Sequence, residues 1–450
     1  MTLANSINGP DSSVAICDQK TTEKISYGEL AERVERRQGE LGELEGFLVF
    51  LGFSTNIETI ITYLALRETG ATTALLDPML DKVRLQTLCD TYSPNKMIGL
   101  PEIGHVDHAT FSQLGADRIL LSTSGSTGSP KFVRLTEDAI QASSQQIATT
   151  SGITHNDRAL LSLPLHYSFG LSVLNSHLLA GAGLVIGAHA SMSPNFALEI
   201  ATSAVTNLFA VPFSIDVFRR TALMNQQLGQ LRSVTVAGGR LAPDITLSTY
   251  EALARQNIDL IIRYGATEAT SAISMLAAQD LPKCIGSAGT PLHGINVSVI
   301  DPDETGVGNL RVCGPNVMLG YAYSRADLGL GSMNGGCIVV DDQARIDSDG
   351  RLWIAGRSGR FAKIKGLRIN LDEIESNLAG SLRCAAVESS DQVVLLVETS
   401  TSLSRSAREI EQQLNVRPGT IRVQTIDELP RTPSGKIDRR SATEIVHIKP

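Results

Sequence analysis

One run of small polar residues ends in a lysine and is suited to holding phosphate groups. The run STSGSTGSPK occupies residues 122–131 and follows the apolar residues 118–121. Glycine and serine let successive backbone N–H groups turn toward one anion, and Lys131 adds a positive charge. A Walker A loop would need a glycine before this lysine, where the chain has Pro130. A flexible surface linker is the alternative, but the proline, the lysine and the preceding apolar segment favour phosphate binding.

Two further segments place charged residues where phosphate chemistry could use them. Glu268 ends the segment YGATE, which follows the apolar residues 259–263. The end of such a strand is where open α/β sheets bind ligands, and a solvated surface carboxylate is the alternative. Lys436 ends the segment RTPSGK, whose proline and glycine predict a tight turn able to present the lysine. The alternative for Lys436 is the usual solvated lysine near a chain end.

The composition excludes several classes of protein. Hydrophobic residues at 42% and charged residues at 19% are typical of a globular protein. The formal net charge of −8 leaves no basic excess for nucleic acid. The chain shows no apolar stretch that approaches a membrane span and no basic, apolar leader, so we expect a soluble cytoplasmic protein. Its six cysteines are far apart in the sequence, which excludes a local zinc knuckle and predicts reduced core thiols.

Short apolar runs alternate with helical patterns up to about residue 350, which predicts β-α units and largely parallel sheets. Most of these runs are wholly apolar, as strands covered on both faces are. Ser26 and Glu29 predict a capping box at a helix start, and Ser193 followed by Pro194 predicts another helix start. The expected strands are residues 46–53, 118–122, 159–163, 184–187, 207–211, 233–237 and 259–263.

The final segments are shorter and alternate differently, which predicts a second, smaller domain. We expect an α/β fold with a large N-terminal domain of stacked mixed sheets, residues 1–357, and a small α+β C-terminal domain, residues 358–450. The joint is expected in the glycine-rich residues 356–359. The elements expected in the small domain are a helix from Asn370 with Glu373 as capping partner, a strand at 392–398, a helix capped by Ser406 and Glu409, and a strand at 421–426.

These segments together resemble the motifs of the ANL adenylate-forming superfamily, which contains acyl- and aryl-CoA synthetases, adenylation domains of peptide synthetases and beetle luciferases. The run at 122–131 resembles its signature loop, YGATE at 264–268 its Y-G-x-T-E motif, and RTPSGK its terminal P-x-[ST]-x-x-G-K motif. The resemblance extends in the family's order over nearly the whole chain. Shorter matches lie at residues 26–30, 70–78, 308–321, 349–357 and 363–375.

The resemblance implies a two-step reaction. A carboxylic acid attacks the α-phosphate of ATP, which releases pyrophosphate and leaves an acyl-adenylate, and a thiol then displaces AMP. The implied cofactors are ATP and Mg²⁺, and the implied acceptor is coenzyme A or the phosphopantetheine of a separate acyl carrier protein. The small domain is implied to be mobile and to swing between the two steps, which brings residues 363–366 toward the acceptor.

The resemblance also assigns roles to individual residues. Lys436 would bridge the carboxylate and the α-phosphate, Thr267 would contact the α-phosphate, and Glu268 would place Mg²⁺. The implied nucleotide-binding residues are Thr123, Ser124, Gly125, Ser126, Thr127, Gly128, Lys131, Gly238, Gly239, Tyr264, Gly265, Asp342 and Arg357, with Asp342 on the ribose. The implied substrate-binding residues are His166, Tyr167 and Gly170. For Gly238 and Gly239, an ordinary turn at a strand end is the alternative.

Departures from the family pattern leave alternatives open. Gly359 stands at the family's hinge aspartate, and Tyr167 stands where many acyl-CoA synthetases have histidine. The segment 164–170 contains no aspartate of the kind that meets an amino group, so a fatty, aryl or other non-amino acid is expected. An amide-forming synthetase with an amine acceptor is one alternative. A catalytically impaired ATP- or acyl-binding scaffold is another, motivated by Gly359 and by Val340 and Asp341. No feature favours a luciferase-like oxygenase.

Overall fold

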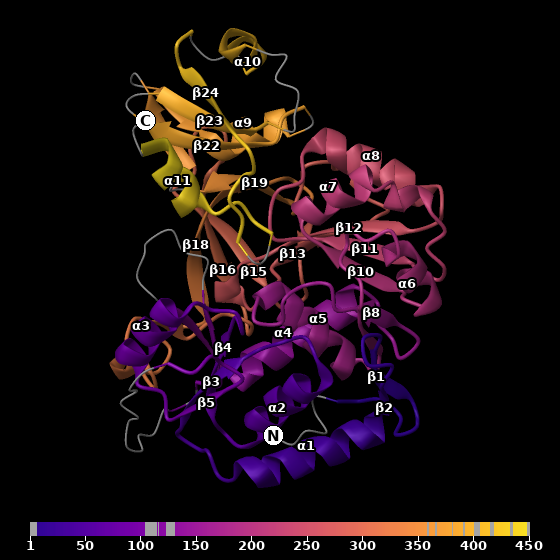
Figure 1. Cartoon of the computed structure of the whole chain (residues 1–450). Helices are drawn as coiled ribbons and strands as arrows, with labels where there is room; N and C mark the ends of the chain where they lie inside the picture. Colours follow the sequence, from indigo (N-terminus) through magenta and orange to yellow (C-terminus); the bar gives the residue numbers. More distant parts are fainter. Residues whose placement is uncertain are drawn as a thin grey trace.

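The computed structural model describes most of the chain, and Figure 1 shows its elements in order. The first two sheets are large and mixed, a four-stranded antiparallel sheet follows them, and smaller sheets lie toward the C-terminus. This arrangement confirms the expected α/β architecture. The described residues are 7–103, 115, 117–122, 131–357, 360–364, 367–379, 381–389, 392–399, 406–414, 418–432 and 435–447.

The 9-stranded sheet is parallel in its centre and antiparallel at its ends, in the order β14-β13-β12-β11-β10-β8-β9-β1-β2. The expected parallel pairing is therefore confirmed for the central strands, whose carboxyl ends share one edge. The strands are β1 (Val14–Asp18), β2 (Lys24–Ser26), β8 (Arg158–Leu160), β9 (Gly183–Ile186), β10 (Asn207–Ala210), β11 (Ser233–Val236), β12 (Asp259–Tyr264), β13 (Ser274–Leu276) and β14 (Thr290–Pro291).

The 6-stranded sheet has the order β17-β7-β6-β4-β3-β5. Its strands are β3 (Leu48–Gly52), β4 (Thr72–Leu76), β5 (Lys96–Ile98), β6 (Ile119–Ser122), β7 (Phe132–Leu135) and β17 (Gly320–Ala322). Ser122 and Phe132 are register partners, so both ends of the glycine-serine run meet at one point of the sheet. Two residues further along β7, Arg134 Nη2 donates to Asp117 Oδ1 over 3.0 Å, and both side chains are fully buried. This internal ion pair fixes β7 against the start of β6.

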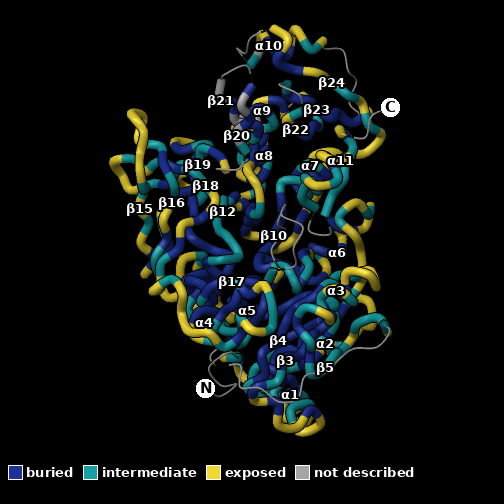
Figure 2. The backbone as a smooth tube through the Cα atoms, turned by 90° about the vertical axis from the view of Figure 1, so that its left-hand side faces the viewer, coloured by how far each residue is buried: buried dark blue, intermediate teal, exposed yellow. Residues whose placement is uncertain are grey.

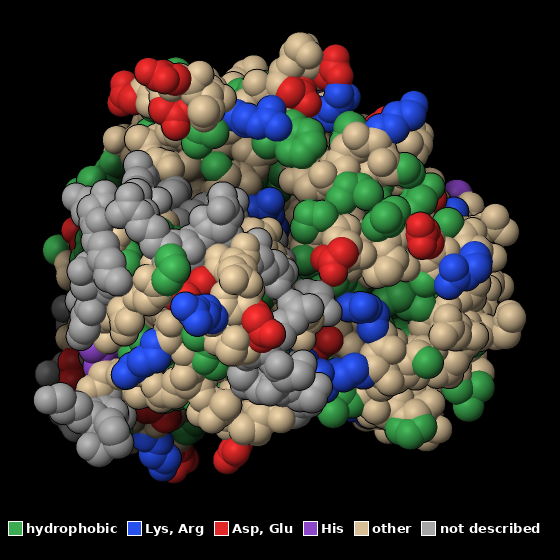
Figure 3. Space-filling model, turned by 90° about the horizontal axis from the view of Figure 1, so that it is seen from above, with side chains coloured by type: hydrophobic (Ala, Val, Ile, Leu, Met, Phe, Trp, Pro, Cys, Tyr) green, Lys and Arg blue, Asp and Glu red, His purple; other side chains and the backbone are tan. Residues whose placement is uncertain are grey.

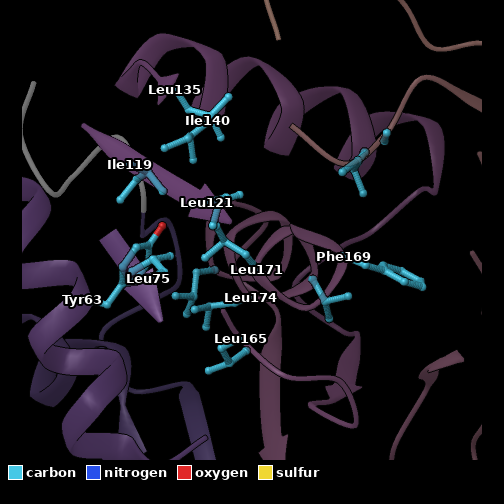
Figure 4. Packing of buried hydrophobic residues seen from close by; sticks show 14 of the residues in the cluster. Tyr63, Leu75, Ile119, Leu121, Leu135, Ile140, Leu165, Phe169, Leu171 and Leu174 are labelled. Atoms are coloured by element: carbon cyan, nitrogen blue, oxygen red, sulfur yellow. The ribbon is translucent and has the colours of Figure 1, made fainter. Parts of the chain in front are cut away.

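The helices pack around these two sheets, and α5 is buried on almost every side. Residues 168–178 of α5 are all buried although five of them are polar, and the helix lies in the largest hydrophobic core. Figure 4 shows Leu171 and Leu174 of α5 near Leu75 of β4 and Leu121 of β6, with Phe169 set apart from them. The helices are α1 (Tyr27–Leu41), α2 (Ile57–Glu68), α3 (Lys82–Tyr92), α4 (Glu137–Thr150), α5 (Ser168–Leu179), α6 (Phe196–Thr202), α7 (Pro212–Arg220) and α8 (Pro243–Ala254).

Two of the expected helix starts differ from the structure. Ser26 Oγ caps α1 by accepting from the backbone N–H of Glu29, but the Glu29 carboxylate binds Arg33 over 2.7 Å, so only half of the capping box forms. An ion pair one turn along the helix competes for that carboxylate. The helix expected at Ser193 begins later, at Phe196, because the Ser193 hydroxyl accepts from the Asn195 N–H and closes a turn.

A third sheet overturns the prediction that all cysteines are reduced. It contains β15 (Asn296–Ile300), β16 (Gly308–Cys313), β18 (Cys337–Ile346) and β19 (Leu352–Arg357), all antiparallel. Register places Cys313 opposite Cys337 with their Cα atoms 4.1 Å apart, and the two form a disulfide. Sequence separation hides this pair, since only antiparallel register brings the two residues together. The other cysteines, 17, 89, 284 and 384, are buried and free.

Breaking the disulfide is expected to lower stability. The bond closes a loop of 24 residues, so the Cys313→Ser/Cys337→Ser double variant should lose about 3 kcal/mol of unfolding free energy through a less constrained unfolded chain. Urea unfolding under non-reducing conditions measures this loss, and wild-type protein in reductant should match the double variant. Alkylation of denatured, unreduced protein should modify four thiols; modification of all six would contradict the pairing.

The segments after β19 build a small unit with its own hydrophobic clusters. The predicted strands at 392–398 and 421–426 are present, and Ser406 and Glu409 form the predicted reciprocal capping box. The strands β20, β21 and β22 and the helix α11 are additional elements that the sequence patterns did not predict. The elements are β20 (Phe361–Ile364), β21 (Leu367–Asn370), α9 (Leu371–Leu378), β22 (Cys384–Ser389), β23 (Gln392–Glu398), α10 (Ala407–Gln413), β24 (Ile421–Ile426) and α11 (Arg439–His447).

Burial follows this layering. Figure 2 shows buried stretches in the interior around β3, β4 and β10, and exposed stretches at the outer turns. On the face seen in Figure 3, Lys and Arg side chains are interspersed with Asp and Glu over the coloured atoms. Among the helices of the described ranges, none is long and apolar enough to cross a bilayer.

Candidate active site

A glycine after β11 brings three distant segments together. Gly238 has a φ of +82°, which favours glycine. A Cβ at this position would lie 2.7 Å from Tyr167 Oη and 3.5 Å from Lys436 Cε. The turn after β11, the segment before α5 and the C-terminal turn therefore meet at the carboxyl edge of the 9-stranded sheet. Gly239, the next residue, faces Pro212 instead.

Lys436 is held in a closed turn. The backbone N–H of Gly435 donates to Thr432 O and the N–H of Thr432 donates to Lys436 O, each over 2.8 Å, and Gly435 has a φ of +79°. Lys436 Nζ lies 4.9 Å from the centre of the Tyr167 ring, within cation–π range. The lysine that the sequence singled out thus lies beside two other predicted site residues, Gly238 and Tyr167.

Two contacts hold the C-terminal unit against α7. Arg383 Nε lies 3.2 Å from Asp216 Oδ2, and the guanidinium of Arg431 lies 4.1 Å from the centre of the Phe213 ring. Both partners on α7 follow the end of β10, so they lie near the same sheet edge as Gly238. These contacts fix the position of the turn that carries Lys436.

Thr267 and Glu268 lie in a short 3-10 helix, Thr267–Ala269, directly after β12. The hydroxyl of Thr267 is 3.2 Å from the hydroxyl of Ser168 at the start of α5. Gly265 makes the tight turn before them possible, since a Cβ there would lie 1.6 Å from Ser271 O. Larger residues at position 265 would therefore displace both Thr267 and Glu268.

Lys131 and Glu268 share a neighbour, Tyr321 of β17. Tyr321 Oη donates to Glu268 Oε1 over 2.7 Å, and Lys131 Nζ lies 3.9 Å from the centre of the Tyr321 ring. Burial raises the pKa of Tyr321, with the Glu268 charge adding to the effect, so the phenol stays protonated and donates. The lysine that ends the glycine-serine run is thereby placed close to the Glu268 carboxylate. Residues 123–128 of that run lie outside the described residues.

Asp342 of β18 faces two other predicted nucleotide-binding residues. Tyr264 Oη donates to Asp342 Oδ2 over 2.6 Å, and Arg357 Nε lies 3.5 Å from Asp342 Oδ1. Burial raises the pKa of Asp342, and Arg357 and the tyrosine hydrogen bond oppose that rise. The register of β18 with β19, which pairs Asp342 with Arg357, explains why these two residues meet.

The predicted substrate-binding residues are not all brought together. Tyr167 lies beside Gly238 and Lys436, but His166 Nε2 lies 3.9 Å from Asp77 Oδ2, on the side of the 6-stranded sheet. Burial lowers the pKa of His166, partly offset by Asp77. A Cβ at Gly170 would lie 2.2 Å from Pro164 O, so this glycine permits close packing at the start of α5.

Sequence reasoning missed Tyr321, Ser168 and Arg263 as neighbours of the site. Tyr321 lies in the G-Y pair at residues 320–321, which belongs to the short family match at 308–321 but carries no predicted site role. Ser168 carried no signal. Arg263 interrupts an otherwise apolar strand, and this interruption was the available signal.

The charged residues fit a magnesium ion held with phosphates. Within the described ranges no group of three or more His, Cys, Asp or Glu side chains could hold a metal alone. Mg²⁺ keeps several waters and is usually bound by one or two carboxylates together with substrate phosphates. Glu268 offers one carboxylate, of which Tyr321 occupies only Oε1 among the described donors. The arrangement can therefore hold a metal-phosphate group between Glu268 and Lys131.

Comparisons with known proteins show which sequences and folds this chain resembles. The family model described as AMP-binding enzyme matches residues 118–322. The chain is 29% identical to 2-succinylbenzoate–CoA ligase of Bacillus velezensis, over 76% of this chain and 72% of the relative. It is 30% identical to the non-ribosomal peptide synthetase CmlP of Streptomyces venezuelae, over 72% of this chain and 34% of the relative. The solved o-succinylbenzoate coenzyme A synthetase (MenE) of Bacillus subtilis, in complex with ATP and magnesium ion, shares the fold at a TM-score of 0.76, with 22% identity and coverage of 95% and 96%.

Proposed function

Because this chain belongs to the adenylate-forming superfamily, we propose that it activates a carboxylic acid with ATP as an acyl-adenylate, releases pyrophosphate, and transfers the acyl group to a thiol. The observation that supports this most strongly is the position of Lys436 beside Gly238 and Tyr167 at the sheet edge that also carries Thr267. These residues come from segments far apart in the chain. Because they lie together, the site contains the ammonium group of Lys436 and the hydroxyl groups of Tyr167 and Thr267.

Binding of the triphosphate is assigned to the glycine-serine run and to the residues around Glu268. In this proposal the N–H groups of residues 123–128 and the ammonium of Lys131 hold the β- and γ-phosphates. Thr267 donates to the α-phosphate and Glu268 holds the metal. A bound Mg²⁺ would offset the charge of the departing pyrophosphate. Asp342 accepts from the ribose hydroxyls, with Arg357 beside it, and Tyr264, Gly265, Gly238 and Gly239 line the rest of the nucleotide site.

The first chemical step, formation of the acyl-adenylate, brings two negatively charged groups together. The attacking carboxylate and the α-phosphate repel each other, and a cation placed between them lowers that barrier most when charge accumulates. We assign this role to Lys436. Removal of the lysine by a swing of residues 358–450 relative to residues 1–357 would then open the site to the acceptor. The two-domain division at residue 357 is part of the proposal.

The acid is proposed to be a fatty, aryl or other non-amino carboxylic acid, contacted by His166, Tyr167 and Gly170. The named relative acts on 2-succinylbenzoate, which supports an acid without an amino group near the reacting carboxylate. Coenzyme A is the proposed acceptor. The phosphopantetheine of a separate acyl carrier protein is an alternative thiol acceptor. An amine acceptor would give an amide instead of a thioester. Incubating adenylated enzyme with each acceptor and weighing the products separates them.

Carboxylate-dependent exchange of pyrophosphate into ATP tests the function. Purified protein with ATP, Mg²⁺ and a panel of fatty, aryl and dicarboxylic acids should incorporate labelled pyrophosphate only when a cognate acid is present. Binding of ATP with no exchange for any acid would contradict the proposed activity and would favour the binding scaffold. The same panel with amino acids serves as the specificity control.

Loosening the contact between Asp216 and Arg383 is expected to slow the first step modestly. Asp216→Ala should lower pyrophosphate exchange about threefold, since a partly exposed ion pair contributes on the order of 0.2–1 kcal/mol. Thioester formation from supplied acyl-adenylate should not fall, because that step does not use Lys436. Glu251→Ala, which removes an exposed carboxylate from α8, is the matched control. Equal slowing of both steps would contradict the assignment.

A further inference from the structure

An arginine lies inside the protein on the strand that leads to Thr267 and Glu268. Arg263 of β12 is 3% exposed. Side chains alternate along a strand, so Arg263 shares a face with Ile261, which packs against the core that contains α5. Its Nη2 donates to Ser172 Oγ of α5 over 2.9 Å. The guanidinium therefore lies between the 9-stranded sheet and α5.

The described neighbours of Arg263 leave its charge uncompensated. Its Nε has no hydrogen-bond partner, and no carboxylate of the described residues acts on the guanidinium. Ser172 is neutral, and its hydroxyl already accepts from Ser271 and donates to Phe169 O. The Phe169 ring, centred 4.3 Å from Arg263 Cζ, provides a cation–π contact. Such a contact offsets only part of what burying an unpaired cation costs.

The other titratable groups nearby do not supply a negative charge. His177 of α5 is fully buried and its Nδ1 lies 2.8 Å from Val173 O, while its Nε2 has no hydrogen-bond partner among the described residues. Burial lowers the pKa of His177 to about 4, so the ring is neutral at pH 7. Burial also lowers the pKa of Arg263, to about 9, and the nearby Tyr167 phenol opposes this shift, so the group remains a cation at pH 7. Among the described residues, Arg263 is therefore a buried cation with no anion beside it.

A continuous row of contacts joins Arg263 to the reaction centre. Lys436 Nζ lies over the Tyr167 ring, the Tyr167 and Phe169 ring centres are 6.5 Å apart, and Phe169 lies against Arg263. The Phe169 ring also meets that of Phe209 from β10, at 6.0 Å. An acid whose reacting carboxylate lies at Lys436 would run along these aromatic rings toward Arg263.

We propose that the acid carries a second anionic group, a carboxylate at its far end, and that Arg263 binds this group. This inference rests on the proposed function and narrows its substrate class to dicarboxylic acids activated at one end. The missing counter-charge of Arg263 then comes from the substrate. A charge-assisted hydrogen bond from Nε would pair the nitrogen that the protein leaves unpaired, and the aromatic rings would cover the linking carbons.

The test compares each dicarboxylic acid with its own monomethyl ester, which removes one charge and adds a single methyl group. Straight-chain diacids of increasing length and the benzenedicarboxylates form the panel, and kcat/KM for pyrophosphate exchange is the readout. At least one diacid should exceed its monoester by about 100-fold, as expected for a lost charged hydrogen bond in a buried site. Because this comparison of diacid with monoester uses wild-type protein only, its result does not depend on whether a variant folds.

The variant Arg263→Met should bring this ratio between diacid and monoester close to one. Arg263→Lys, which keeps the charge and loses the planar donors, should retain part of it. Arg345→Met is the matched control, since Arg345 also stacks on an aromatic ring, that of Trp353, and the ratio should stay at its wild-type value. Ratios near one in the wild type, or a high ratio that survives in Arg263→Met, would overturn the inference.

A binding measurement keeps this inference separate from the proposed function. Calorimetry of each diacid and monoester with wild-type protein and with Arg263→Met, in the absence of ATP, reports the second group directly. If no acid drives exchange but diacids bind and the variant abolishes that binding, the activity fails and the anion site stands. If monoacids drive exchange and Arg263→Met weakens mono- and dicarboxylates equally, Arg263 meets the reacting carboxylate and the inference is wrong.

Discussion

Lys436→Ala is expected to reduce carboxylate-dependent pyrophosphate exchange about 1000-fold, which corresponds to about 4 kcal/mol of lost transition-state stabilisation. The ammonium lies beside Gly238 and Tyr167, where the carboxylate and the α-phosphate are proposed to meet. Their charges are closest in the transition state, so the loss should appear in kcat more than in the KM for ATP. Isotope exchange at saturating acid measures it.

Two controls isolate the role of Lys436. Lys283→Ala removes an exposed lysine from a 3-10 helix and should leave exchange at the wild-type level. Thioester formation from chemically prepared acyl-adenylate should continue in Lys436→Ala, because the second step is proposed to proceed after the lysine has left. If Lys436→Ala retains near-wild-type exchange, the lysine is not the adenylation catalyst. If the wild type shows no exchange and the variant binds ATP equally well, the scaffold alternative is supported.

Glu268→Gln is expected to lower exchange by about 100- to 1000-fold through loss of metal binding. The substitution keeps the size of the side chain and an acceptor for Tyr321 Oη, but removes the negative charge that holds Mg²⁺. The apparent affinity for Mg²⁺ should fall, and a higher Mg²⁺ concentration should restore part of the rate. A titration of exchange rate against Mg²⁺ at fixed ATP gives both quantities.

Tyr321→Phe is the matched control for Glu268. It removes the hydrogen bond to the carboxylate and keeps both the carboxylate and the ring against which Lys131 lies. Its effect on exchange should be about tenfold or less, because the carboxylate that is proposed to hold the metal remains and loses only one supporting hydrogen bond. If Glu268→Gln were no worse than Tyr321→Phe and did not respond to Mg²⁺, the proposed metal role of Glu268 would be refuted.

Local sequence signals predicted elements well where one interaction dominates. The apolar runs that became β10, β11 and β12 have strong β preference and stand alone between turns, so their positions were readable. Predictions were less reliable where one side chain could bind either of two partners. Glu29 could cap α1 or pair with Arg33, and the structure has the ion pair. The Cys313 and Cys337 pair depended on register across a sheet, which spacing alone does not reveal.

The order and content of its motifs determined the family, the α/β class and the residues to examine, because a phosphate-binding run, a strand-end carboxylate and a lysine in a tight turn are each short and local. Only the tertiary structure decided which of them meet. Lys436 lies beside Tyr167 because Arg383 and Arg431 hold the C-terminal unit on α7. Likewise, only the tertiary structure shows that Arg263 is buried with no carboxylate beside it among the described residues, because the neighbours of a strand residue come from distant parts of the chain.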